Sequence, residues 1–251
     1  MGHAIYEQLK DTARRVAQGL PRITFYERHP EEVGRSGRYL VENALVQNCR
    51  LHLDESLLEC AHGMNHCEAV ARDAGAIVLV EGADRGMSGL ALEQIFSLAV
   101  IAGLLHDVKR REQDHALLGS IEAERILSSV GMEKRHRDYV THAIRNHEAF
   151  KATCDLDDEA GCLVSDALYD ADKFRWGPEN FTTTLWTMVS SNNTAPERLH
   201  EVFQEKMKGI ERIKETFRTA TGRRFGPEFI DQGLLIGNAI YEEMGLLLKQ
   251  D

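Results

Sequence analysis

The stretch that most constrains the fold is residues 98–115, LAVIAGLLHDVKRREQDH. It begins as an apolar run, reaches a His106–Asp107 pair and then becomes strongly charged. Ala99, Ala102 and His106 stand at i, i+3 and i+7, so one helical face carries two small residues and then a histidine. A helix buried along most of its length would therefore deliver an imidazole and a carboxylate, side by side, to its far end.

Net charge and apolar patterning exclude two classes of partner. The formal charge of −10 argues against binding to duplex nucleic acid, because no basic face compensates for it. No apolar run approaches the ~20 residues that a membrane helix needs, and we expect no membrane partner. The N-terminal residues are charged and lack the apolar core of a signal peptide.

The cysteines indicate a reducing compartment. There are five, an odd number, and none form a CxxC pair. This pattern fits free thiols better than a disulfide framework. We therefore expect a soluble, cytoplasmic protein.

Hydrophobic periodicity predicts an all-α chain that forms a single domain over residues 1–251. Two stretches rich in proline and glycine, 21–37 and 221–227, are typical of loops. The run 77–80 resembles a short strand, but its brevity favours the end of a helix followed by a loop. Helical patterns cover residues 4–20, 40–49, 115–128, 134–147, 160–174, 197–218 and 228–249.

Histidine and aspartate side chains cluster on the predicted inner faces of successive helices. A single histidine on an apolar face is usually a core residue, but six such groups converging on one interior need another explanation. Buried carboxylates are costly unless a cation or strong donors compensate them. A divalent metal does so, and imidazole and carboxylate ligands suit Mn, Fe, Ni, Zn or Mg. The six groups are His66, His106, Asp107, His115, His147 and Asp172.

The order of these residues resembles a known family. His66, the LLHD of residues 104–107 and the ADKF of residues 171–174 are similar to the H…HD…D pattern of the HD-domain metal-dependent phosphohydrolase superfamily. The segments HCEAVARDA, AGLLHDVKR and HAIRNHE agree with it, so the resemblance covers roughly residues 58–176. It implies an HD-domain helical bundle as the metal-binding core. Residues 1–57 and 177–251 would be additional N- and C-terminal helices.

The resemblance also implies a ligand set. His66, His106, Asp107 and Asp172 would be the primary metal ligands. His115 and His147 match positions that bind a second metal in some members and contact phosphate in others. One or two divalent ions would bind per chain, and with two ions Asp107 is the natural bridge.

Several neighbouring side chains compete for roles in this site. Asp166 and Asp170 are alternatives to Asp172 as the last metal ligand. They share a helical face with Lys173 that is interpreted as a solvated or salt-linked stripe, so we favour Asp172. His62 is interpreted as a supporting or exposed residue. Lys109, Arg110 and Arg111 follow the HD pair and either hold phosphate oxygens or form an ordinary charged surface. We assign catalytic roles to Asp107, Lys109 and His115, and substrate contacts to Arg110, His147, Lys173 and Arg175.

The resulting hypothesis is a phosphomonoesterase or phosphodiesterase that uses a metal-activated water on a nucleotide or similar small phosphorylated metabolite. The sequence lacks the GYP run of HD-GYP phosphodiesterases and the acidic pair that usually follows HD in alarmone hydrolases. Two alternatives stay open: a di-iron oxygenase, whose fuller H…HD…H…H…D set is present, and a catalytically silent regulatory module. The two C-terminal helices would either close the back of the domain or form a homodimer face.

Overall fold

The computed structural model describes residues 2–53, 63–154 and 156–249, and within these ranges all regular secondary structure is helical. This confirms the predicted fold class. The elements are α1 (Gly2–Gly19), α2 (Thr24–Arg28), α3 (Pro30–Glu42), α4 (Ala44–Arg50), α5 (Met64–Asp84), α6 (Gly89–Leu105), α7 (His115–Ser129), α8 (Lys134–Arg145), α9 (Glu159–Phe174), the π-helical turn η2 (Asn180–Thr184), α10 (Leu185–Ser191), α11 (Pro196–Glu211), the 3₁₀ turn η3 (Arg212–Glu215) and α12 (Ala220–Leu247).

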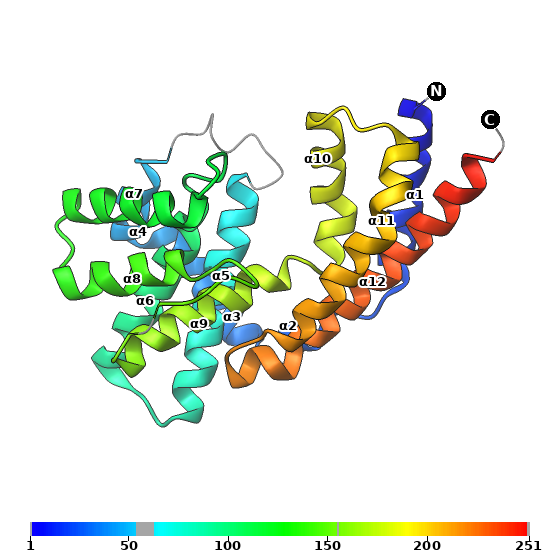
Figure 1. The fold of residues 1–251 in the computed structure, drawn as a ribbon. Helices are drawn as coiled ribbons and strands as arrows, with labels where there is room; N and C mark the ends of the chain where they lie inside the picture. The colour runs from blue at the N-terminus through cyan, green and yellow to red at the C-terminus, as the bar shows by residue number, and fades with distance from the viewer. Residues whose placement is uncertain (1, 54–62, 155, 250–251) are drawn as a thin grey trace.

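The helices form two groups that lie side by side (Figure 1). Helices α3 to α9 make one group, which contains the segment that resembles HD-domain proteins. Helices α1, α10, α11 and α12 make the other, and the two chain ends lie together there. Helix α12 joins the groups, because it packs on α1 and α11 and also contacts α5 and α9.

Helix α5 is the central helix of the first group. It packs against α3, α6, α9 and α12 and is buried almost all round. Residues 77–80 are helical rather than a strand, as favoured from the sequence, and α5 ends one turn later, at Asp84. A helix surrounded by other helices carries apolar residues on every side, and this removes the periodicity that would have identified it.

The loop expected over residues 21–37 is wrong except at residues 21–23 and 29, because the rest of this region is α2 and most of α3. Pro30 is the first residue of α3, where its missing N–H costs nothing. The predicted helix 40–49 is interrupted at Asn43. Its side chain accepts hydrogen bonds from the backbone N–H groups of Leu45 and Val46, at 3.0 and 3.2 Å, and so begins α4.

The loop expected over residues 221–227 is the start of α12, which includes Pro227. Thr219 caps this helix, and its hydroxyl accepts from the N–H of Gly222 at 2.7 Å. Two buried carboxylates from the first helix group complete the cap. Asp170 accepts from the N–H of Thr219 at 2.8 Å, and Glu81 accepts from the N–H of Thr221 at 2.6 Å.

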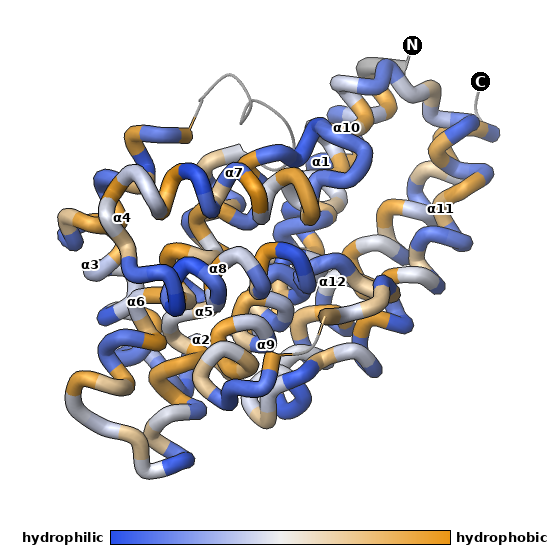
Figure 2. The backbone as a smooth tube through the Cα atoms, turned by 60° about the vertical axis from the view of Figure 1, so that its left-hand side comes forward, coloured by the Kyte–Doolittle hydropathy of each residue, from blue (hydrophilic) through white to orange (hydrophobic). Residues whose placement is uncertain are grey.

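The two C-terminal helices are amphipathic, as predicted, although their bounds differ. Figure 2 shows hydrophobic and hydrophilic turns alternating along α11 and α12. The apolar side chains Phe203, Met207 and Ile240 are buried where the two helices pack together. This packing places α11 and η3 near the histidine and aspartate cluster.

No helix in the described parts of the chain combines the length and apolar character needed to cross a bilayer. Cys49, Cys67, Cys154 and Cys162 are free thiols. The fifth cysteine, Cys60, lies outside the described residues, as does His62.

Candidate metal centre

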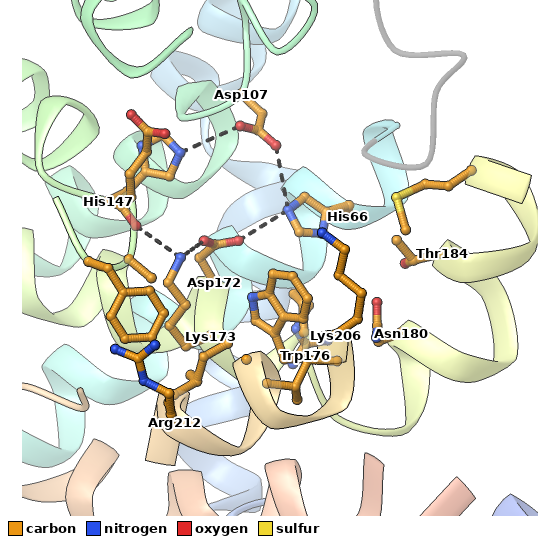
Figure 3. A pocket seen from close by; sticks show the side chains of 18 of the residues that line it. His66, Asp107, His147, Asp172, Lys173, Trp176, Asn180, Thr184, Lys206 and Arg212 are labelled. Atoms are coloured by element: carbon orange, nitrogen blue, oxygen red, sulfur yellow. Dashed lines mark hydrogen bonds and ion pairs between the residues drawn. The ribbon is translucent and has the colours of Figure 1, made fainter. Parts of the chain in front are cut away.

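The first turn of α5 supplies His66, whose side chain is buried. Its Nε2 lies 3.3 Å from Nε2 of His106 and 3.4 Å from Oδ1 of Asp172. Oδ2 of Asp107 lies 3.8 Å from the same nitrogen. Side chains from α5, α9 and the end of α6 therefore converge on one point (Figure 3).

His106 and Asp107 stand where the buried helix α6 ends, as the sequence predicts. Nδ1 of His106 lies 2.8 Å from the carbonyl oxygen of Gly103. A carbonyl only accepts hydrogen bonds, so Nδ1 carries the proton and Nε2 presents its lone pair to the centre. Burial lowers the pKa of His106 to about 4, which keeps the ring neutral at pH 7.

A second pair of imidazoles lies on the other side of Asp107. His115 begins α7, and His147 follows the end of α8. Their Nε2 atoms lie 3.3 Å apart. Nδ1 of His147 lies 2.6 Å from the carbonyl oxygen of Ile144, which turns Nε2 toward the centre in the same way.

Asp107 divides its two carboxylate oxygens between the two histidine pairs. Oδ2 lies 3.5 Å from Nε2 of His106 and 3.8 Å from that of His66. Oδ1 lies 3.6 Å from Nε2 of His147 and 3.9 Å from that of His115. Asp107 is therefore shared by the two histidine pairs.

The donor set fits a metal ion. The ligand atoms form two buried groups, His66–His106–Asp107 and Asp107–His115–His147, and within each group they lie within 4.8 Å of one another. Imidazole lone pairs that face one another at 3.3 Å repel unless a proton or a cation lies between them. The cluster can therefore bind a metal ion, and its nitrogen and oxygen donors do not select among Mn, Fe, Ni, Zn and Mg.

Asp172 is on α9, and Lys173 next to it is buried. Nζ of Lys173 donates to Oδ2 of Asp172 at 2.6 Å and to the backbone carbonyl of His147 at 2.9 Å. Burial raises the pKa of Asp172, but Lys173 and the nearby imidazoles outweigh burial and hold it well below its usual value. Asp172 is therefore ionised and fixed in place beside His66.

The rival aspartates on α9 face elsewhere. Asp170 is fully buried, and its oxygens accept from the backbone of Arg218 and Thr219 at the start of α12. Of the two interpretations of this face, a solvated or a salt-linked stripe, the solvated one is wrong, because Asp170 and Lys173 are both buried. Asp166 is half-buried, and its carboxylate lies 4.0 Å from the guanidinium of Arg218.

The cations after the HD pair lie in different places. Nη1 of Arg110 lies 2.8 Å from Nε2 of His115, and Arg110 lines the cavity beside the centre. Lys109 is half-buried and Arg111 is exposed, and neither is among the residues that line this cavity. Of these three cations, Arg110 is therefore the one the structure brings to the site.

Arg175 also lines the cavity, but its guanidinium is held by other protein groups. It donates to Asp73 and, at 2.7 Å, to the hydroxyl of Tyr26. Its other amino group donates to Glu179 at 2.8 Å. This buried network was not foreseen from the sequence, because α2, α5 and α9 meet there only in the tertiary structure.

The cavity has a volume of about 670 Å³ and contains His66, Asp107, His115, His147 and Asp172 in its lining. Part of its wall comes from segments outside the region of family resemblance. This part includes Asn180, Thr184, Met188 and several residues of α11 and η3 between 205 and 213. The sequence carries no local signal for the contribution of α11 and η3, since their residues read as an ordinary amphipathic helix.

No family model and no curated protein matches the chain. Among solved structures, the crystal structure of a predicted HD superfamily hydrolase from an uncultured Thermotogales bacterium is similar. The two chains are 20% identical, and the match covers 85% of this chain and 94% of that chain with a TM-score of 0.45.

Proposed function

We propose that this protein is a metal-dependent phosphohydrolase that acts on a nucleotide or a similar small phosphorylated metabolite. One observation carries the proposal: Asp107 presents one oxygen to each of two buried histidine pairs, at the end of a cavity large enough for a small molecule. His66, His106, Asp107, His115, His147 and Asp172 would hold one or two divalent ions, which would supply an activated water and compensation for negative charge on the phosphoryl group.

The protein's own side chains orient the substrate. Arg110 stands at the cavity wall beside His115 and offers N–H donors to phosphoryl oxygens. Lys173 holds Asp172 and the backbone of His147 together, so it fixes ligands from two elements. Both hydrogen bonds of the Lys173 ammonium group go to protein atoms. We therefore propose that Lys173 positions Asp172 and compensates its negative charge.

The test is metal analysis and activity of the purified chain. Wild type is compared with His115→Ala and His147→Ala, and with His136→Ala as a histidine control on α8 outside the cavity lining. We expect bound divalent metal in wild type and in the control, and less metal in the two site variants. Hydrolysis of p-nitrophenyl phosphate or bis(p-nitrophenyl) phosphate should require that metal, and chelation should abolish it.

Failure to bind any metal, before or after its addition, contradicts the proposal. Metal binding with no hydrolysis of either ester or of a panel of phosphorylated metabolites contradicts the activity and leaves a silent metal-binding module.

A di-iron oxygenase is the second candidate. The observation that favours it is that the full H…HD…H…H…D set faces one centre: His66, His106, Asp107, His115, His147 and Asp172. Two irons per chain, an absorption band that develops in air, and oxygen consumption without phosphate release would select this function over hydrolysis.

A further inference from the structure

Arg110 contacts one of the histidine nitrogens that a second metal ion would need. It lies three residues after Asp107, is half-buried and lines the cavity. Its Nη1 lies 2.8 Å from Nε2 of His115. A guanidinium has N–H donors and no acceptor, so Nε2 of His115 accepts this hydrogen bond. The lone pair of this nitrogen is therefore engaged by Arg110.

The same nitrogen belongs to the second group of candidate ligands. Nε2 of His115 lies 3.3 Å from Nε2 of His147 and 3.9 Å from Oδ1 of Asp107. A metal ion binds imidazole through the lone pair of a neutral ring nitrogen. The Arg110 guanidinium and a second ion therefore compete for one lone pair, and only one of them can use it at a time.

Charge acts in the same direction as this competition. Nε of Arg110 lies 3.9 Å from Oδ2 of Asp107, so the guanidinium places a positive charge beside the carboxylate that both histidine pairs share. A divalent cation at His115 would meet a like charge at short range. The repulsion is strong there because Asp107, His115 and His147 are all buried.

The first histidine pair has a carboxylate where the second has a guanidinium. Oδ1 of Asp172 lies 3.4 Å from Nε2 of His66 and 3.8 Å from Nε2 of His106. The ammonium of Lys173 binds the other oxygen of Asp172, so Oδ1 is the one that faces the imidazoles. The first half of the centre therefore offers two carboxylates to an ion, and the second half offers only the shared carboxylate of Asp107.

We propose that Arg110 weakens the binding of a second metal ion, so that the half of the centre with Asp172 fills before the half with His115. The inference rests on the proposed function, because it concerns the same metal centre, and it deepens that function by distinguishing the two ions. Until the second ion displaces the guanidinium from His115, Arg110 supplies the positive charge on that side of Asp107.

The experiment is a titration of Mn²⁺ into the metal-free full chain, in which EPR spectroscopy measures the free ion. We expect wild type to bind the second ion at least about 10-fold more weakly than the first. Arg110→Met removes the charge and the N–H donors but keeps a long side chain, and it should tighten the second ion at least about 5-fold relative to the first. Adding His115→Ala to this variant should remove the second ion, which would assign the gain to this half of the centre.

Arg111→Met is the matched control, because it removes the neighbouring charge from an exposed position outside the cavity lining. It should keep the wild-type ratio of the two affinities. Equal affinity of wild type for two ions, or the same ratio in Arg110→Met as in wild type, overturns the proposal. A second ion that binds to neither protein overturns it as well. Arg110→Ala repeats the test if Arg110→Met unfolds.

Failure of this inference and failure of the proposed function are separable. A preparation that binds two ions equally and hydrolyses p-nitrophenyl phosphate retains the proposed function and overturns the inference. A preparation in which Arg110→Met tightens the second ion, but which releases no phosphate, supports the inference and counts against hydrolysis. No uptake of Mn²⁺ overturns the inference, and hydrolysis with the other divalent ions then tests the function.

Discussion

Asp107 is the residue on which both halves of the candidate centre depend, because each of its oxygens faces a different histidine pair. We predict that Asp107→Asn lowers metal affinity by at least about 10-fold, since the amide is neutral and presents a single oxygen. Titration of metal into the apo variant measures this. Asp166→Asn, which changes a half-buried aspartate of α9, should bind metal as wild type does, and equal affinity of all three proteins would contradict the proposed role of Asp107.

Gly103 sets how closely α5 and α6 approach just before the HD pair. A Cβ atom at this position would lie 2.4 Å from the Cα of Ala71, which is backbone and cannot rotate away. We predict that Gly103→Ala lowers the free energy of unfolding by roughly 1–3 kcal/mol, as overpacking does. Urea unfolding measures the change, and a neutral or stabilising effect would be inconsistent with the packing described.

Gly34, in the interior of α3, is the matched control. A Cβ there would meet only the Arg38 guanidinium, at 3.5 Å. Gly34→Ala should stabilise the chain by about 0.5–1 kcal/mol, because alanine loses less backbone entropy in a helix.

At the scale of the element, α9 depends on its N-terminal cap. Asp158 accepts from the N–H groups of Ala160 and Gly161, at 3.0 and 3.2 Å. Hydrogen bonding by Tyr139, and then by Arg135, lowers the pKa of Asp158 from 3.8 to about 2. Since α9 carries Asp172, this cap also supports the metal centre.

We predict that Asp158→Ala lowers the free energy of unfolding by about 1 kcal/mol at pH 7. The folded-state pKa is below the ordinary value, so the carboxylate stabilises the folded chain above pH 3.8, and this contribution is lost as the pH falls to about 2. Urea unfolding of metal-free protein over this range should show the difference from wild type shrinking. Asp157→Ala, an exposed neighbour, should have little effect at any pH.

At the scale of the whole molecule, the two helix groups are joined through the start of α12. Asp170, fully buried on α9, accepts from the N–H groups of Arg218 and Thr219, both at 2.8 Å, and from the Thr219 hydroxyl at 2.7 Å. There is no space for a side chain at Gly222, where a Cβ would lie 2.0 Å from the Asp170 carboxylate.

We predict that Asp170→Ala lowers the free energy of unfolding by roughly 2–4 kcal/mol, because the N–H groups of Arg218 and Thr219 lose their acceptor. Asp166→Ala, one turn earlier on α9 and half-buried, should cost less than about 1 kcal/mol. Similar unfolding midpoints for the two variants would show that Asp170 does not hold the groups together.

Much of the candidate site could be predicted from the sequence because its signals are local. The apolar run before His106 ends in a helix terminus, His115 begins the next helix, and Gly131, with φ of 76°, ends that helix as predicted. Helical spacing and capping residues act over a few positions, so the order and type of these elements follow from short-range rules. The all-α fold class follows in the same way.

Only the tertiary structure decided that most of residues 21–37 and all of residues 221–227 are helical, against expectation, and that α5 continues to Asp84. In each case groups far away in the chain determine the outcome. Asp170 and Glu81 satisfy the first N–H groups of α12, and the surrounding helices bury all faces of α5. The cavity wall from α11 follows the same principle: its residues are unremarkable in the sequence, and packing on α12 brings them to the cavity that contains the histidine–aspartate centre.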